Sequence, residues 1–333
     1  MLQPKFLSIR SNILKKEVST IRNIVIVIII LIVTSVVFSS VIYLGTGYNE
    51  ISEITYDGER WIKNQYYCPP LSSSGVETTR YLFVNLRDLG FCIVDKANMV
   101  ILEQIDTFHA EDITFDINKL KFYIADGIGL SVFFLESPSK VWNRGTIHLR
   151  GWISQVELFG DYIILSSLYD GIYLLSECSG HFIMLDYFGR TYDDPLEQPL
   201  MTLSIRTHGR TIYVAAEDGI HLMRVSANKL FHELKLTNTM SLDVAVNSSY
   251  IAAAEPLQKR VSLFLTSSRE KIAELLYPNQ PTAVHLIEDE NTGEIFLATI
   301  VTGTGLIIDN IPTGDRWTIG GSYTGFIRKV SVQ

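Results

Sequence analysis

From residue 80 onward the chain is a succession of short apolar runs separated by turn residues. The clearest case is Phe122 to Leu135, where an apolar run, Asp126-Gly127 and a second apolar run predict a β-hairpin. Five further hairpins follow this pattern, some of them loosely, and the first runs of all six contain these large residues: Leu82, Tyr123, Tyr162, Tyr213, Tyr250 and Phe296. The gaps of 41, 39, 51, 37 and 46 residues between them are typical of the blades of a β-propeller.

Each hairpin is flanked by two more apolar runs, so that every repeat supplies four strands, and six of each kind can be counted. The last run, Phe326 to Val332, has no hairpin of its own. We expect residues 326–332 to pair beside Tyr81 to Leu86 and to close the ring, which removes exposed sheet edges. The sequence therefore predicts an all-β, six-bladed propeller over residues 80–333. A seven-bladed ring that uses part of Ile51 to Tyr67 is the alternative.

A different pattern precedes the repeats. Ile24 to Leu44 is a run of 21 residues without a charge, and a helix of that length spans the roughly 30 Å hydrocarbon core of a membrane. The run is too long for most cleavable signal cores, so we interpret it as a retained single-pass transmembrane helix. Residues 1–23 form a basic tail, which predicts a cytoplasmic N-terminus and a propeller outside the cell membrane. Residues 45–79 are rich in proline and serine near Cys68 and are predicted to be a linker.

The same region has a second interpretation. Lys15 to Thr20, followed by the apolar run, resembles the processing site of archaeal type IV pilin-like proteins. Glu17 stands where that family has a small residue, and Arg22 interrupts the apolar face. The resemblance implies a filament subunit that is processed near Glu17, whereas a retained anchor predicts an intact N-terminus.

Charge narrows the range of partners. The net charge is −8, and residues 1–23 hold about +4 of their own, which leaves about −12 for the rest. A domain this acidic is repelled by phosphate backbones, so we expect no nucleic-acid partner. The three cysteines allow at most one internal disulfide, and their spacing does not decide whether Cys68 pairs with Cys92 or with Cys178.

The repeat also resembles a known family. The pattern Tyr-x-Ala-Asp-Gly-x-Gly-Leu-x-Val stands at Tyr123 to Val132, is echoed at Tyr213 to Leu222, and is similar to LVIVD-repeat proteins. The resemblance covers residues 80–333. It is clear in four blades, whereas Glu255 to Arg260 and Val301 to Gly305 lack the Asp-Gly turn. It implies a surface or exported β-propeller of bacteria or archaea, and it carries no general catalytic residues.

Candidate chemistry is sparse. Three acids at equivalent turns are each followed by glycine, as a tight hairpin turn requires: Asp126, Asp170 and Asp218. His109, Glu111 and Asp112 precede one inner strand and would suit acid-base or metal chemistry, but the other inner-strand starts are not acidic. We therefore expect no metal, no cofactor and no catalytic residues. A metal-dependent propeller hydrolase or lactonase is the alternative in the enzyme class.

Loops between blades supply the remaining candidates. Arg150, Trp152 and Tyr323 fall in the equivalent connections before the inner strands of two blades. His109 and Asp112 fall in the corresponding connection of a third blade. Together these five residues form a predicted partner-binding face. Arg, Trp and Tyr are enriched at protein interfaces because they offer a large contact area. We expect a protein-binding or cell-surface scaffold module rather than an enzyme. Its expected partner is another surface protein or a second copy.

One modification sequence is present. Asn247-Ser-Ser249 is the only Asn-x-Ser/Thr site in the chain, and it lies in a predicted hairpin. An outside location would make Asn247 a glycosylation candidate.

Overall fold

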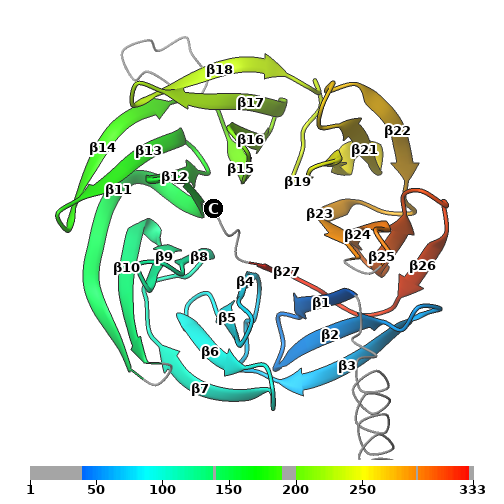
Figure 1. Ribbon diagram of the computed structural model, residues 1–333, viewed down its shortest axis with the longest axis horizontal. Helices are drawn as coiled ribbons and strands as arrows, with labels where there is room; N and C mark the ends of the chain where they lie inside the picture. The colour runs from blue at the N-terminus through cyan, green and yellow to red at the C-terminus, as the bar shows by residue number, and fades with distance from the viewer. Residues whose placement is uncertain (1–39, 138–139, 190–199, 290–291, 330–333) are drawn as a thin grey trace, which may run out of the picture. The chain divides into compact units, whose positions relative to one another are not determined.

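The computed structural model describes residues 40–137, 140–189, 200–289 and 292–329. Within these ranges the chain forms 27 β-strands and one short 3-10 helix, η1 (Pro256–Gln258). The strands form four-stranded antiparallel groups that follow one another around a ring (Figure 1), and we call each group a unit. Some neighbouring units are joined by strand pairing, so that the described residues contain seven units in five continuous sheets.

Each unit extends from an innermost strand near the centre of the ring to an outermost strand. In that order, unit 1 consists of β27 (Gly325–Lys329), β1 (Ser40–Gly45), β2 (Glu50–Tyr56) and β3 (Trp61–Tyr67). Unit 2 consists of β4 (Gly75–Glu77), β5 (Tyr81–Asn85), β6 (Phe91–Asp95) and β7 (Val100–Ile105). Unit 3 consists of β8 (Asp112–Asp116), β9 (Lys121–Ala125), β10 (Gly127–Ser137) and the first half of β11 (Lys140–Phe159).

The second half of β11 begins unit 4, which continues with β12 (Tyr162–Ser167), β13 (Gly171–Cys178) and β14 (His181–Phe188). Unit 5 consists of β15 (Thr202–His208), β16 (Thr211–Ala216), β17 (Gly219–Ser226) and β18 (Lys229–Lys235). Unit 6 consists of β19 (Asp243–Val246), β20 (Tyr250–Glu255), β21 (Arg260–Leu265) and β22 (Lys271–Leu276). Unit 7 consists of β23 (Pro281–Glu288), β24 (Ile295–Val301), β25 (Gly305–Asn310) and β26 (Arg316–Ile319).

The core lies between neighbouring units. Each of seven clusters of buried apolar side chains joins two adjacent units among the described residues. Between units 2 and 3, for example, Phe122 packs on Phe83 and Phe115 with ring centroids 4.6 Å and 4.7 Å apart. Successive strand residues point to opposite sheet faces, so continuous runs of β-branched and aromatic residues bury both faces of a unit.

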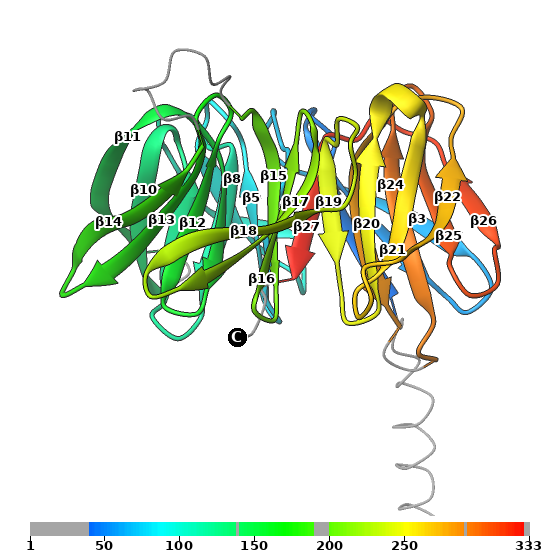
Figure 2. The same ribbon diagram turned by 90° about the horizontal axis from the view of Figure 1, so that it is seen from above.

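Connections emerge at two faces of the ring because neighbouring strands run in opposite directions. The turn between the second and third strands of each unit emerges at the same face as the connection to the next unit. We call this face the loop face. In Figure 2 the loop face is at the top, where the yellow turn that contains η1 joins β20 to β21. This arrangement gathers side chains from sequence-distant turns onto one surface.

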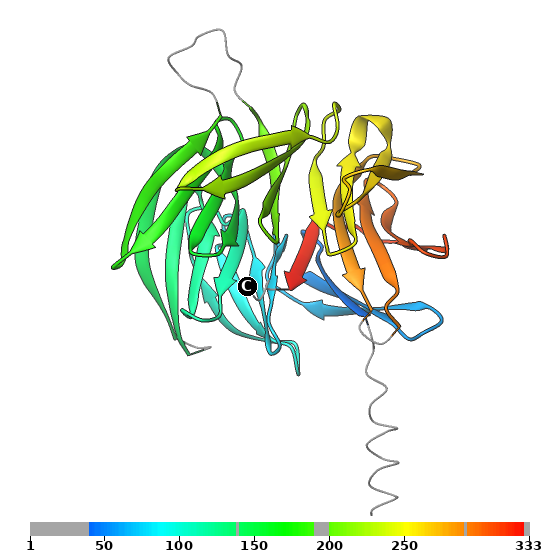
Figure 3. The ribbon, with the colours of Figure 1, turned by 45° about the horizontal axis from the view of Figure 1, so that its top comes forward.

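The ring is closed by the two ends of the described chain (Figure 3). β27 pairs antiparallel with β1, where Tyr43 lies opposite Ile327. It also pairs in parallel with β4, where Ile327 lies opposite Gly75. Among the described residues, the last strand is therefore the innermost strand of the unit that contains the first three strands.

Two predictions about this closure are wrong. Residues 45–79 are not a linker, because they contain β2, β3 and β4. The last strand does not pair with β5, since β4 already occupies the inner side of β5. The hairpins of residues 40–67 form three strands that lack an inner partner, and β27 takes that place. This topology adds one unit to the six predicted ones and uses Ile51 to Tyr67, as the seven-bladed alternative does.

The predicted transmembrane helix lies mostly outside the described residues, as do the basic tail and Glu17. Its last five residues, Ser40 to Leu44, are a strand instead. In β1, Ile42 and Leu44 are buried in the cluster shared with unit 7, and Tyr43 in the cluster shared with unit 2. Within the described ranges no helix has both the length and the hydropathy of a bilayer span.

Candidate functional site

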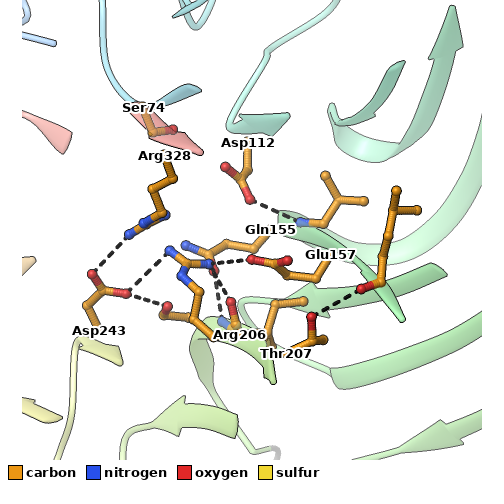
Figure 4. A network of polar contacts seen from close by, with 12 residues as sticks. Ser74, Asp112, Gln155, Glu157, Arg206, Thr207, Asp243 and Arg328 are labelled. Atoms are coloured by element: carbon orange, nitrogen blue, oxygen red, sulfur yellow. Dashed lines mark hydrogen bonds and ion pairs between the residues drawn. The ribbon is translucent and has the colours of Figure 1, made fainter. Parts of the chain in front are cut away.

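Polar side chains from the inner strands of six units converge inside the ring, and most of them are labelled in Figure 4. We call this group the axial network. Its members are Asp112 (β8), Gln155 and Glu157 (β11), Arg206 (β15), Asp243 (β19), His285 (β23) and Arg328 (β27).

Arg206 is the most connected member of the axial network, and its side chain is only 9% exposed. Its Nη1 donates hydrogen bonds to Gln155 Oε1 at 3.2 Å and to Glu157 Oε1 at 3.1 Å, and it also donates to the carbonyl of Ile205. Its Nη2 forms an ion pair with Asp243 Oδ1 at 3.6 Å. One guanidinium therefore links three consecutive units.

Asp243 connects this cation to the closing strand. Its Oδ2 accepts hydrogen bonds from Arg328 Nη2 at 3.1 Å and from the backbone amide of Val284 at 3.0 Å. Its Oδ1 accepts a hydrogen bond from the Ser204 hydroxyl at 2.5 Å. Asp112 is also buried and accepts a hydrogen bond from the backbone amide of Val156 at 3.2 Å. The axial network therefore links the inner strands of six units.

Burial shifts the protonation equilibria of the axial network. Removal from water raises the pKa of Glu157 to about 7, although Arg206 works against this shift. Burial likewise raises the pKa of Asp112. Burial and the nearby Arg328 and Arg206 lower the pKa of His285 to about 3, so this imidazole is neutral at physiological pH.

The positive and negative side chains of the axial network form ion pairs with one another. Two guanidinium groups face three carboxyl groups, and in the described part of the chain no group of three His, Cys, Asp or Glu side chains has a metal-binding arrangement. Sequence analysis missed this network because it considered only the residues at the starts of inner strands. The available signal was polar residues at alternate positions inside those strands, such as Gln155 and Glu157.

A second cluster lies on the loop face between units 2, 3 and 4. The imidazole Nε2 of His109 lies 3.2 Å from Glu111 Oε1, and its Nδ1 contacts the carboxylate of Asp88. The indole of Trp152 donates to the same Glu111 oxygen at 2.9 Å, and the His109 and Trp152 rings meet edge to face at 5.2 Å. These contacts fix the orientation of the indole.

Exposed aromatic side chains flank this cluster. Phe108, next to His109, is 57% exposed, and Tyr169 is 55% exposed. The turn that carries Tyr169 is adjacent to the part of β11 that carries Trp152, because the amide of Leu168 donates to the carbonyl of Trp152 at 2.8 Å. We call Asp88, Phe108, His109, Glu111, Trp152 and Tyr169 the aromatic patch.

Gly151 lets β11 turn from unit 3 into unit 4 beside this patch. Its φ of +76° lies in the left-handed region, and a Cβ there would stand 2.0 Å from Asp170 Oδ2. Glycine is therefore required for Trp152 to reach its position.

A shallow hollow of about 520 Å³ lies at the edge of unit 1. It is lined by Tyr48, Asn49, Glu50, Gln65, Tyr66 and Tyr67. Tyr48 and Tyr67 are both exposed, so aromatic surface at the loop face extends to this unit.

Solved structures share this architecture, whereas no family model and no curated protein matches the sequence. The β-propeller domain of Cps50 (Swd1) from Myceliophteria thermophila aligns with a TM-score of 0.59 and 12% identity, covering 85% of this chain and 97% of that one. Sqt1 from Saccharomyces cerevisiae aligns with a TM-score of 0.60 and 13% identity, covering 85% and 83%. A Lactobacillus plantarum protein aligns with a TM-score of 0.68 and 10% identity, covering 86% and 98%.

The chain has a β-propeller fold. Identities this low show the fold alone, and membership of the LVIVD-repeat family stays a prediction because no family model matches.

The propeller brings together only part of the predicted partner-binding face. His109 and Trp152 are in contact, and Arg150 is exposed two residues before the indole. Asp112 belongs to the axial network instead. Tyr323 is buried in the cluster between units 7 and 1, where its hydroxyl donates to the carbonyl of Gly320 at 3.1 Å.

The acids of the Asp-Gly turns do more than shape turns. Asp126 is buried and accepts hydrogen bonds from the His109 amide at 2.6 Å and the Ser131 hydroxyl at 2.5 Å. Asp218 accepts from Lys235 at 2.6 Å and lies 2.7 Å from His221 Nε2. These carboxylates therefore brace the loops of the propeller.

Asn247 occupies a tight turn. Its Oδ1 accepts hydrogen bonds from the amides of Ser249 at 2.9 Å and Tyr250 at 2.7 Å. Its Nδ2 is buried, so the folded turn does not present the atom to which a glycan attaches.

Proposed function

We propose that this protein is a membrane-anchored, extracytoplasmic, seven-bladed β-propeller that acts by binding another surface protein through the aromatic patch. The observation that carries the proposal is the exposure of Phe108 and Tyr169 beside an indole that is already held in place. Aromatic side chains give a large contact area at low entropic cost, and a fixed indole loses little further freedom on binding.

The chemistry of the patch favours a partner segment that combines apolar and basic residues. Asp88 is 71% exposed, and Glu111 lies beside the indole. Carboxylates next to aromatic faces attract Lys and Arg side chains through ion pairs and cation-π contacts. The acidic charge of the chain after residue 23 would add long-range attraction for such a segment.

Anchoring remains a proposal from the sequence. Because β1 begins at Ser40, the anchor would be the uncharged stretch from Ile24 to Ser39. This is slightly short for a typical span, and a bilayer accommodates such a stretch by local thinning or by snorkelling of flanking residues such as Arg22. The basic tail would then lie in the cytoplasm and the propeller outside.

Location is tested with the cysteines. Cys178 is exposed, whereas Cys68 and Cys92 are buried. A membrane-impermeant maleimide applied to intact cells is expected to label the chain once, and Cys178→Ser is expected to abolish the label. Labelling that appears only after cell lysis would place the propeller inside and contradict the proposal. Peptide mapping of the same sample distinguishes an intact N-terminus from processing near Glu17.

Binding is tested by photo-crosslinking the full chain in its native membrane. A photoactivatable residue at position 108 is expected to yield a discrete adduct, and Trp152→Ala is expected to reduce its yield about tenfold because the patch loses its fixed centre. The same residue at Phe231, an exposed aromatic on β18, is the matched control and should give no such adduct. Equal adducts from both positions would contradict the proposal, and an adduct of two copies of this chain would replace the other surface protein with self-association.

A further inference from the structure

Two of the three thiols meet inside the propeller. Cys68 follows β3 in unit 1 and Cys92 lies in β6 of unit 2, and both side chains are fully buried. Their sulfur atoms are 3.9 Å apart, and both are free thiols in this structure. Cys178 lies in β13 of unit 4 and is exposed. The geometry therefore decides between pairings that sequence spacing left open.

The backbone on both sides holds the two thiols together. The amide of Cys68 donates to the carbonyl of Asn49 at 3.0 Å, and Cys92 is paired within its sheet with Val84 and Gln104. Their side chains share one apolar cluster with Leu82 and other residues of units 1 and 2. A disulfide requires the sulfur atoms to approach to about 2.05 Å, so the two thiols must come closer by roughly 2 Å.

We propose that Cys68 and Cys92 form an intramolecular disulfide when the chain folds in the presence of a disulfide oxidant, and that Cys178 remains a free thiol. One thiolate attacks the oxidant's disulfide and forms a mixed disulfide while one oxidant thiol leaves. The second cysteine then attacks the mixed disulfide, forms the Cys68–Cys92 bond and releases the other oxidant thiol. The two cysteines lose two electrons and two protons, and the oxidant is reduced to two thiols.

Burial determines when this reaction takes place. The contact with Cys68 and removal from water raise the pKa of the Cys92 thiol well above its usual range, so little thiolate exists in the folded, reduced protein. Oxidation therefore belongs to the folding chain, while units 1 and 2 come together and solvent still reaches the thiols. The finished bond is shielded from reductants by the same cluster.

The bond would join the end of β3 to unit 2. That position is next to the ring closure, where β27 lies between β1 and β4. In the outward location that we propose above, the compartment itself supplies the oxidant, and this part of the inference rests on that location. The capacity to form the bond does not depend on it.

The test uses the purified full chain in detergent, unfolded and reduced, and then refolded in a buffer of reduced and oxidised glutathione. Free thiols are alkylated under denaturing conditions and the peptides are mapped by mass spectrometry. We expect a linked pair of peptides containing Cys68 and Cys92, about 2 Da lighter than the two thiol peptides together, and an alkylated Cys178. Alkylation of all three cysteines, or a link that includes Cys178, would overturn the proposal.

Stability supplies an independent readout. Protein refolded with a reductant is expected to melt about 5–10 °C below protein refolded in the glutathione buffer, because its unfolded chain keeps the freedom of the open loop. Cys178→Ser should respond in the same way, whereas Cys92→Ala should melt at the same temperature with and without reductant. The peptide map needs no variant, so it decides the proposal even if Cys92→Ala does not fold. Labelling of Cys178 in intact cells reports location separately.

Discussion

Replacement of Arg206 by methionine is expected to lower the free energy of unfolding by about 3–5 kcal/mol. Methionine has a similar length but no charge, so Glu157 would lose the cation that lies 3.1 Å away, and Asp243 would lose the one at 3.6 Å and keep only Arg328. An unpaired buried carboxylate costs far more than a lost surface contact, because it has given up its hydration without compensation. The loss is measured from urea unfolding curves.

Arg224→Met is the matched control for this substitution. Arg224 lies on β17 in the same unit, is 56% exposed, and forms one ion pair with Glu233 at 3.5 Å. Its loss should cost less than about 1 kcal/mol. Combining Arg206→Met with Glu157→Gln should restore part of the stability, because an amide at position 157 does not need the cation. A stability of Arg206→Met within about 1 kcal/mol of the parent protein would show that the axial network is dispensable.

Two variants of the axial network are expected to have opposite pH dependence. The folded pKa of Glu157, about 7, is above its unfolded value of roughly 4.3, so its stabilisation is present at low pH and is lost as the pH rises through 7. The folded pKa of His285, about 3, is below its unfolded value of roughly 6.5, so its contribution is lost as the pH falls below 6.5. Between pH 5 and 7.5 the two contributions oppose each other.

Each of these contributions amounts to about 2 kcal/mol over that pH range. We therefore expect His285→Gln to be about 2 kcal/mol less stable at pH 7.5 than at pH 5, relative to the parent protein. Glu157→Gln should show the reverse difference. Unfolding curves of all three proteins at both pH values make the comparison, and Asp112, whose pKa is also raised, is common to all three. Parallel pH profiles for the two variants would contradict the assignment of these shifts.

The repeats were predictable because turn chemistry and strand patterning agree in them. At Asp126-Gly127 the glycine has a φ of +62° between two buried strands, as the hairpin signal indicates. Unit 1 was missed although Asp57-Gly58 marks the turn between β2 and β3, because its first strand lies within the predicted membrane span. The residues of β1 continue an apolar run, and a buried strand and part of a membrane helix have the same composition there.

Contacts between units were not predictable from spacing. The edge-to-face pair of His109 and Trp152 depends on how β11 turns at Gly151, and the Cys68–Cys92 contact depends on an inner strand supplied from the far end of the chain. The sequence alone suggests that Arg206 is an ordinary exposed residue of a strand. In the structure it is buried, because the other inner strands surround it. Sequence patterns report burial within a strand, whereas these sites arise from the closure of the ring.

That closure also has consequences for biosynthesis. β1 is made well before β27, so a nascent chain carries three strands of unit 1 with an unpaired inner edge until β27 has been made. At translation rates of about 5–20 residues per second, this interval lasts on the order of tens of seconds. Premature termination at any codon before Gly325 would leave two open edges, at β1 and β4, available for pairing with another chain. Closure of the ring therefore depends on synthesis continuing through β27, because no earlier strand can take its place between β1 and β4.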